Sequence, residues 1–254
     1  MVYHNYYCDD SRIVEYNMTK KIKALKIVYP DIHMYSRSAS KLRGYFANKH
    51  GDEYVFHNHS GDGFIYEYPK IQYKVLHGKP TIIALDKGID AVYKSVMEEN
   101  EIDIEGKIIS VVGMKIELYE VMVGDSEQIL SYKFATPWLG LNQKNYKAYK
   151  DIKSDEEKKA LLENILIGNI LSMFKGLQIQ LENRIAVRAQ LYETPVDFKN
   201  ETMVGFYGRF MVNCRLPSYF GIGKSVSRGF GTVTRVRNPD DSLKKDGEEH
   251  VENI

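Results

Sequence analysis

Two histidines separated by a single residue, His57 and His59, are the side chains of this sequence best suited to acid–base chemistry. They fall in residues 56–63, a segment whose composition predicts a loop. Imidazole titrates near neutral pH, so one histidine can accept a proton while the other donates one. With a cation to stabilise charge on the phosphate, such a pair can cleave RNA without a metal. The products would carry a 2′,3′-cyclic phosphate and a 5′-hydroxyl.

Simpler interpretations of the histidine pair remain open at this point. A His-x-His sequence is more often a surface or loop pair than a catalytic one. Zinc binding would need a third ligand, for which the neighbourhood offers only His50 or Asp62. The letters His-Asn-His also name a class of metal-dependent DNA nucleases, but those require a much longer ββ-metal arrangement. Tyr66 nearby can equally be an ordinary strand residue.

A basic segment precedes the histidines. Residues 32–51 contain no aspartate or glutamate, and the cations there are Arg37, Lys41, Arg43 and Lys49. Ser36 can cap a helix that runs to about Lys49, so several of these cations would lie on one helix.

A second cationic segment, residues 221–231, contains two Gly-x-Gly pairs, Gly221 with Gly223 and Gly229 with Gly231. The residues between the pairs include Lys224, Ser225 and Arg228. Glycine allows close backbone approach and positive φ, and we expect exposed N–H groups here to form an anion site. Residues 202–239 contain no acid, which in a chain of net charge +1 favours a nucleic-acid backbone as partner. The alternative is a plain pair of β-turns, whereas the spacing excludes a P-loop.

The elements that would position these residues alternate between strands and helices. In the first half, strands are predicted over 21–29, 70–76, 81–85 and 107–112, with helices over 36–49 and from Asp86 onward. The segment 98–105 is predicted to be an acidic loop. This β-α-β-β-α-β order is that of a ferredoxin-like module.

The second half has a similar but less regular pattern. Strands are predicted over 116–122, 130–134, 185–191, 204–212 and 232–236. Ser154 and Glu157 form a capping box for a long helix that Gly176 ends, and an extra short helix spans 142–149. We therefore predict an α+β fold of two tandem ferredoxin-like domains, residues 1–113 and 114–238. Residues 239–254 are predicted to form an acidic, disordered tail.

Composition narrows the class of protein further. Cys8 and Cys214 are too few for a disulfide scaffold or a cysteine-built zinc site. Charged residues interrupt the N-terminus, which excludes a signal peptide, and no apolar segment is long enough for a transmembrane helix. We expect a cytoplasmic protein with no membrane association and no cofactor.

The glycine segment resembles the signature of the repeat-associated RAMP superfamily. More narrowly, residues 41–46, 57–59, 62–68 and 71–75 resemble the CRISPR endoribonuclease that matures guide RNA, the sixth in the Cas naming series. The similarity is greatest to the branch found with type I-B systems, and it extends to about Arg237.

This resemblance implies two ferredoxin-like domains of the RRM or RAMP type and metal-independent cleavage of CRISPR repeat RNA. It assigns catalysis to His57, His59 and Tyr66, with Lys49 as a phosphate partner. Other branches place the catalytic histidine earlier, which makes His33 or His50 the fallback. The residues implied in RNA binding are Lys41, Arg43, Lys49, Gly221, Gly223, Lys224, Ser225, Arg228, Gly229 and Gly231.

Two alternatives to the metal-independent nuclease are kept open. The chain can instead be a non-catalytic RAMP-type protein that holds RNA within a CRISPR effector complex, or, as a weaker alternative, a metal-dependent nuclease. A homodimer and effector-complex subunits are candidate partners besides the RNA, and the two histidines are not assigned as base or acid. If the chain is a nuclease, we expect the histidine region and the glycine segment to share one positively charged groove, within one chain or across a dimer.

Overall fold

The computed structural model describes residues 19–49, 68–198 and 201–236, with the strand positions 59–60, 63–64 and 252–253. The first half of the chain contains β1 (Thr19–Val28), η1 (Ser36–Ser38), α1 (Ala39–Lys49), β2 (His59–Ser60), β3 (Gly63–Phe64), β4 (Ile71–Leu76), β5 (Lys79–Leu85), α3 (Lys87–Met97), β6 (Glu101–Ile104) and β7 (Lys107–Ser110). The second half contains β8 (Lys115–Phe134), α4 (Gln143–Asp151), α5 (Asp155–Gly176), β9 (Val187–Phe198), β10 (Glu201–Arg215), η2 (Val226–Arg228), β11 (Val233–Arg235) and β12 (Glu252–Asn253). The predicted α+β class is confirmed.

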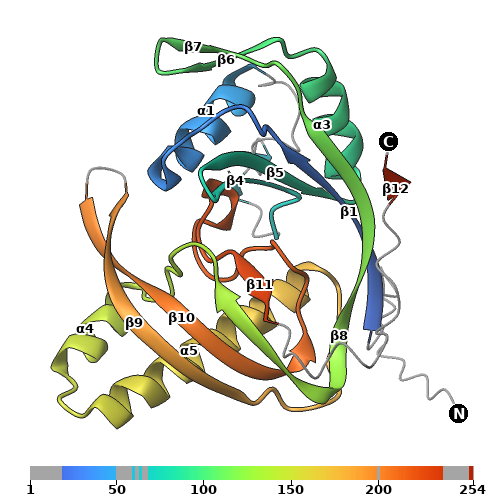
Figure 1. Ribbon diagram of the computed structural model, residues 1–254. Helices are drawn as coiled ribbons and strands as arrows, with labels where there is room; N and C mark the ends of the chain where they lie inside the picture. Colours follow the sequence, from blue (N-terminus) through green and yellow to red (C-terminus); the bar gives the residue numbers. More distant parts are fainter. Residues whose placement is uncertain are drawn as a thin grey trace, which may run out of the picture.

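One curved antiparallel sheet runs through both halves, with its main strands in the order β4-β5-β1-β8-β10-β9. The long strand β8 connects the halves, sweeping from the upper to the lower part of the molecule (Figure 1). Its residues 115–124 pair with β1, and its residues 124–125 and 130–133 pair with β10, with an irregularity in register between them. The two strands expected over 116–122 and 130–134 are therefore a single strand.

The predicted domain boundary near Gly113 lies just before β8. Because the first half of β8 pairs with β1, the sheet continues across this position without a break. The division into residues 1–113, 114–238 and 239–254 stays a prediction, and most of the predicted tail lies outside the described residues.

The first half differs from the predicted ferredoxin-like module mainly in where the strand expected over 107–112 pairs. Its residues form β7, which pairs only with β6 in a separate two-stranded hairpin. The segment expected to be an acidic loop supplies β6, because Glu105 and Gly106 take positive φ and close a tight turn. The place beside β1 is taken by β8 instead.

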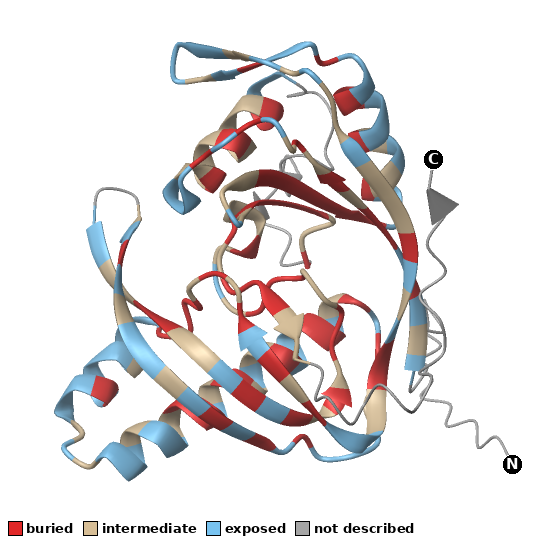
Figure 2. Ribbon diagram, viewed as in Figure 1, coloured by how far each residue is buried: buried red, intermediate tan, exposed pale blue. Residues whose placement is uncertain are grey.

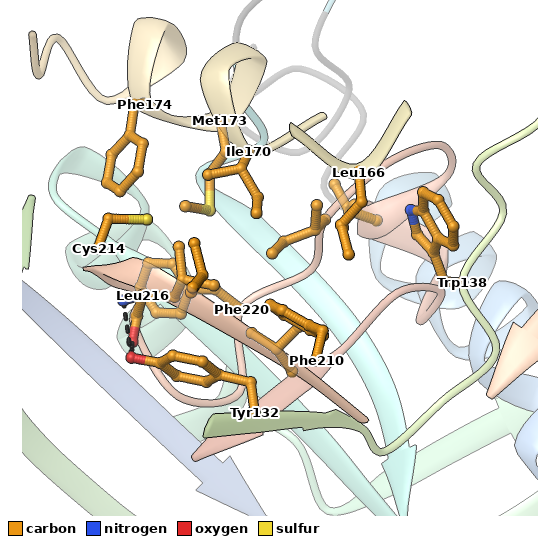
Figure 3. Packing of buried hydrophobic residues seen from close by; sticks show 14 of the residues in the cluster. Tyr132, Trp138, Leu166, Ile170, Met173, Phe174, Phe210, Cys214, Leu216 and Phe220 are labelled. Carbon is orange, nitrogen blue, oxygen red and sulfur yellow. Dashed lines mark hydrogen bonds between the residues drawn. The ribbon is translucent and has the colours of Figure 1, made fainter. Parts of the chain in front are cut away.

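The long helix α5 covers the sheet of the second half. Ser154 accepts a hydrogen bond from the Glu157 N–H, which confirms the predicted N-cap, and the helix ends at Gly176 as expected. Its apolar face projects Leu166, Ile170 and Phe174 onto aromatic side chains of the sheet such as Phe210 (Figure 3). No helix of the described residues is long and apolar enough to cross a membrane.

The strand β4 is buried on both faces, although its sequence alternates apolar and polar residues. Ile71, Tyr73 and Val75 face the core beneath α1 and α3. Gln72 and Lys74, on the opposite face, have no exposed surface. Figure 2 shows β4 and β5 as the most continuously buried part of the first half.

Candidate nucleic-acid interface

The glycine segment packs directly on β4 of the other half. The Gly221 N–H donates to Gln72 Oε1 at 3.0 Å, and the Tyr68 hydroxyl donates to the Gly221 carbonyl at 2.7 Å. At the far end of the segment, Lys74 Nζ donates to Thr232 Oγ1 at 3.0 Å. Both ends of the glycine segment are thus held by the strand that follows the histidine region in sequence.

Gly229 shows why the segment needs glycine at this contact. Its φ is +95°, and a Cβ built there would lie 2.7 Å from Ala39 Cβ and 3.0 Å from the Tyr73 carbonyl oxygen. Any side chain would therefore push η2 away from α1 and β4. The expectation of positive φ is confirmed here and at Gly223 and Gly231.

This packing brings two cations from different halves of the chain together. Burial lowers the pKa of the Arg43 guanidinium in α1, and the nearby charge of Arg228 in η2 lowers it further. Arg228 also lies over the ring of Phe198, 5.5 Å from its centroid. The like charges of these two guanidinium groups disfavour each other, so an anion bound by both would be stabilised.

The expected row of exposed amides is wrong for much of the glycine segment. Several of its N–H groups donate within the protein, to Gln72 Oε1 and to carbonyl oxygens. These groups belong to Gly221, Ile222, Lys224, Arg228, Gly229 and Gly231. The amides mainly hold the segment in place, so anion binding must rely chiefly on its side chains.

Lys224 and Ser225 lie at the exposed turn of the segment. The Lys224 N–H donates to the Leu139 carbonyl, and its ammonium donates to the Leu141 carbonyl at 3.0 Å. Partial burial lowers the pKa of this ammonium. Ser225 takes a φ of +55° at the N-cap of η2, the short helix that contains Arg228.

The remaining cations of α1 face the β6–β7 hairpin. Lys49 lies 2.6 Å from Glu99 Oε1, and Lys41 pairs with Glu105. The Glu99 carboxylate is 1% exposed and also accepts a hydrogen bond from Tyr45. The hydrogen bond to Glu99 raises the pKa of Lys49. Residues four and eight apart share a helix face, so Lys41 and Lys49 diverge from Arg43.

Sequence reasoning missed Gln72, Lys74 and Glu99. The alternation around the first two predicts a solvent-facing side of β4, and nothing in the sequence shows that the glycine segment covers it. Burial lowers the pKa of Lys74 to about 7. Glu99 fell in the segment expected to be a loop.

The predicted catalytic side chains fall where the structure gives no description. His57 and Tyr66 lie outside the described residues, as do His50 and Asp62. His59 is placed in β2, paired with Phe64 of β3, but its side chain is not described. The alternative catalytic histidine, His33, lies beside the β4–β5 turn, where its ring covers Gly78.

Two family models together match most of the chain. The Cas6b N-terminal domain matches residues 20–121, and the Cas6b C-terminal domain matches residues 124–236. The chain belongs to the Cas6b family. The two Cas6b models meet inside β8, the strand that both halves share.

Solved Cas6b structures have the same fold. The one described as "Crystal structure of Cas6b" is 41% identical, with a TM-score of 0.81 over 85% of this chain and 100% of that one. "Crystal structure of CRISPR RNA processing endoribonuclease Cas6b" is 38% identical, with a TM-score of 0.71 over the same shares. The Methanocaldococcus jannaschii protein named "Uncharacterized protein MJ0978" is 41% identical over 142 residues, 56% of this chain and 96% of that protein.

Proposed function

We propose that this protein is a metal-independent endoribonuclease that cleaves CRISPR repeat RNA into guide RNA. Membership in the Cas6b family and the printed activity of a 38% identical relative support this function. The structural observation that carries it is the packing of the glycine segment on α1 and β4, which places Arg43 and Arg228 on adjoining elements of the two halves. A phosphodiester backbone is the polyanion that such a paired cationic surface fits.

In the proposed reaction, one of His57 and His59 removes the proton from a ribose 2′-hydroxyl. The 2′-oxygen then attacks the adjacent phosphorus, the bond from phosphorus to the 5′-oxygen breaks, and the other histidine protonates that oxygen. The products are a 2′,3′-cyclic phosphate and a 5′-hydroxyl, and no other reactant is consumed. Tyr66 and Lys49 are proposed to contact the phosphate as its charge grows.

The RNA is proposed to follow the surface formed by α1 and the glycine segment. Arg43 and Arg228 would hold one phosphate between the halves, and Lys224 would contact the chain further along. Lys41 and Lys49 are held by carboxylates, so each would have to exchange its partner for a phosphate or share it. This exchange makes their contribution to binding smaller than that of the two arginines.

Cleavage of repeat RNA from the source genome in the presence of EDTA tests the proposal. Wild type should give products with cyclic-phosphate ends, identified by 3′ ends that resist alkaline phosphatase until mild acid opens the cyclic phosphate. The His57→Ala, His59→Ala double variant should bind the RNA but cut it at least about a hundredfold more slowly. His77→Asn is the matched control, because it removes a histidine from the exposed β4–β5 turn, where asparagine tolerates positive φ.

The second candidate is a non-catalytic RNA-binding protein of the same superfamily. The docking of the glycine segment favours this function equally, since it concerns binding and not cleavage. RNA binding by wild type without cutting of any repeat would favour the non-catalytic function, whereas inhibition by EDTA would point to a metal-dependent nuclease.

A homodimer, effector-complex partners and a cytoplasmic location stay predictions. Size-exclusion chromatography tests the homodimer.

A further inference from the structure

A pocket of about 480 Å³ with both polar and apolar lining lies between α4, α5 and the glycine segment, and neither Arg43 nor Arg228 lines it. Such a volume is in the range of small-ligand sites. Its polar lining is dominated by asparagines, and no aspartate or glutamate is among the described residues that line it. The polar side chains are Asn142, Asn145, Asn164, Asn169, Ser172 and Lys224.

The hydrogen bonds around the pocket use amide oxygens and leave N–H groups available to donate to a ligand. Asn142 Oδ1 accepts from the Asn145 N–H at 2.7 Å, and Asn169 Oδ1 accepts from the Trp138 indole at 3.1 Å. The oxygen of each amide is therefore used inside the protein, and its NH₂ group remains for a ligand. The Lys224 ammonium spends one donor on the Leu141 carbonyl and keeps two more. A pocket rich in donors and without acids fits a ligand whose edge consists of acceptor oxygens.

Gly168, an exposed residue of α5, leaves one side of the pocket open. It lies in the middle of α5, where glycine is about 1 kcal/mol less favourable than alanine. A Cβ built at Gly168 meets no atom within 4 Å, so no protein contact requires glycine there. Any larger residue would project into the open space of the pocket. The glycine thus keeps a space clear that the protein itself does not fill.

We propose that this pocket binds one nucleotide of the single-stranded RNA, with its phosphate and base oxygens accepting from the asparagine amides and Lys224. The inference rests on the proposed function and adds a subsite to it. The glycine segment supplies Gly223 and Lys224 to the pocket, and Tyr68, another lining residue, follows Tyr66 by two positions in the sequence. A nucleotide held here would fix the register of the RNA relative to the catalytic segment.

Two variants change the pocket without removing a contact of the fold. Asn145→Asp adds a negative charge facing the ligand, keeps the backbone bond to Asn142, and suits the first turn of α4. Gly168→Leu fills the space and favours the helix. Gln143→Glu is the matched control, because it adds the same charge in the same turn of α4 at an exposed residue that does not line the pocket. Thermal unfolding of each variant confirms that the fold is retained.

The measurement is fluorescence anisotropy with repeat RNA that carries a 2′-deoxyribose at the cleavage position. Asn145→Asp and Gly168→Leu should each weaken binding by about tenfold, while Gln143→Glu stays within about twofold of wild type. Equal affinity in all three variants would overturn the pocket as an RNA subsite, and so would an equal loss in Asn145→Asp and Gln143→Glu. Titration with UMP, AMP and inorganic phosphate forms the second arm. A free nucleotide that binds wild type but not Asn145→Asp, with RNA affinity unchanged, would overturn the RNA assignment.

The outcome for the pocket is distinguishable from the outcome for the nuclease. If wild type cuts the unmodified repeat while both pocket variants bind it normally, the proposed function is supported and the subsite is contradicted. Wild type that binds with the expected pocket dependence but never cuts keeps the subsite and removes the nuclease. Wild type that does not bind the repeat RNA removes both.

Discussion

The ammonium of Lys74 lies 3.0 Å from the hydroxyl of Thr232, and neither residue has more than a trace of exposed surface. Lys74 belongs to β4 of the first half, and Thr232 follows the glycine segment of the second. The Thr232 hydroxyl in turn donates to the Gly229 carbonyl. A buried lysine therefore contacts the segment that carries Arg228, and its protonation acts on the stability of that contact.

Replacing Lys74 by methionine should raise the free energy of unfolding by roughly 1–3 kcal/mol at pH 7, because burial penalises the charged ammonium. The pKa of Lys74 is about 7 in the folded protein, against about 10.4 in the unfolded chain. Between these values the unfolded state binds more protons, so stability should rise with pH across the window and level off above it. Urea unfolding of wild type and Lys74→Met at pH 7 and pH 9 checks this. The gain from the substitution should shrink at the higher pH, and Lys107→Met on the exposed hairpin should show neither effect.

Gly229→Ala should destabilise the protein by about 2–4 kcal/mol, because the new Cβ meets Ala39 and the Tyr73 carbonyl at a positive φ. The matched substitution is Gly44→Ala in α1, where a Cβ meets no atom within 4 Å. That change should be neutral or stabilising by up to about 1 kcal/mol. Denaturant unfolding measures both. Equal stability of the two variants would show that η2 does not need close contact with α1.

Replacing only the partner of a buried carboxylate should lower the free energy of unfolding more than replacing both members of the pair. Lys49→Met leaves the Glu99 carboxylate buried without its ammonium, and we expect a loss of about 1–3 kcal/mol, reduced from the fully buried case because Lys49 is half exposed. Adding Glu99→Gln should recover most of that loss, since glutamine still accepts from Tyr45. Lys49→Met should also slow RNA cleavage, and cleavage should stay slow in the Lys49→Met, Glu99→Gln double variant. Recovery of both stability and cleavage would show that Lys49 acts on the fold alone.

Substituting either arginine of the paired cationic contact should weaken RNA binding without weakening the fold. Arg43→Gln and Arg228→Gln should each lower affinity about three- to tenfold and reduce the slope of log affinity against log salt by about 1. Lys159→Gln, an exposed position on α5, is the control with the same charge change. Binding isotherms at several salt concentrations measure the slopes. A loss of affinity with an unchanged slope would mean that these side chains do not contact phosphates.

Most elements of the fold could be predicted from local patterns. The capping of α5 by Ser154 and the hairpin turn at His77 and Gly78 depend on neighbouring residues, and both are present. Local patterns could not predict that β8, and not β7, pairs with β1. Both segments have strand composition, and the choice between them depends on pairing with a strand some ninety residues away in sequence.

The candidate site was predictable in its residues but not in its contacts. The lack of acidic residues in the glycine segment marked Arg228, and the basic helix marked Arg43. The burial of Lys74 and the donor pocket around Gly168 depend on which surfaces pack together, which a single sequence does not reveal. The polar face of β4 is indistinguishable in sequence from a solvent-facing one.

The strand β8 pairs with β1 over residues 115–124 and with β10 at residues 124–125 and 130–133, so one sheet joins the two halves. Separating the halves completely would break backbone pairing along β8. The entropy of bringing the two cationic surfaces together is thus lost during folding, before any RNA arrives. An incoming strand would meet two cationic surfaces already joined by one sheet, so the shape of the RNA should contribute to selection among RNAs.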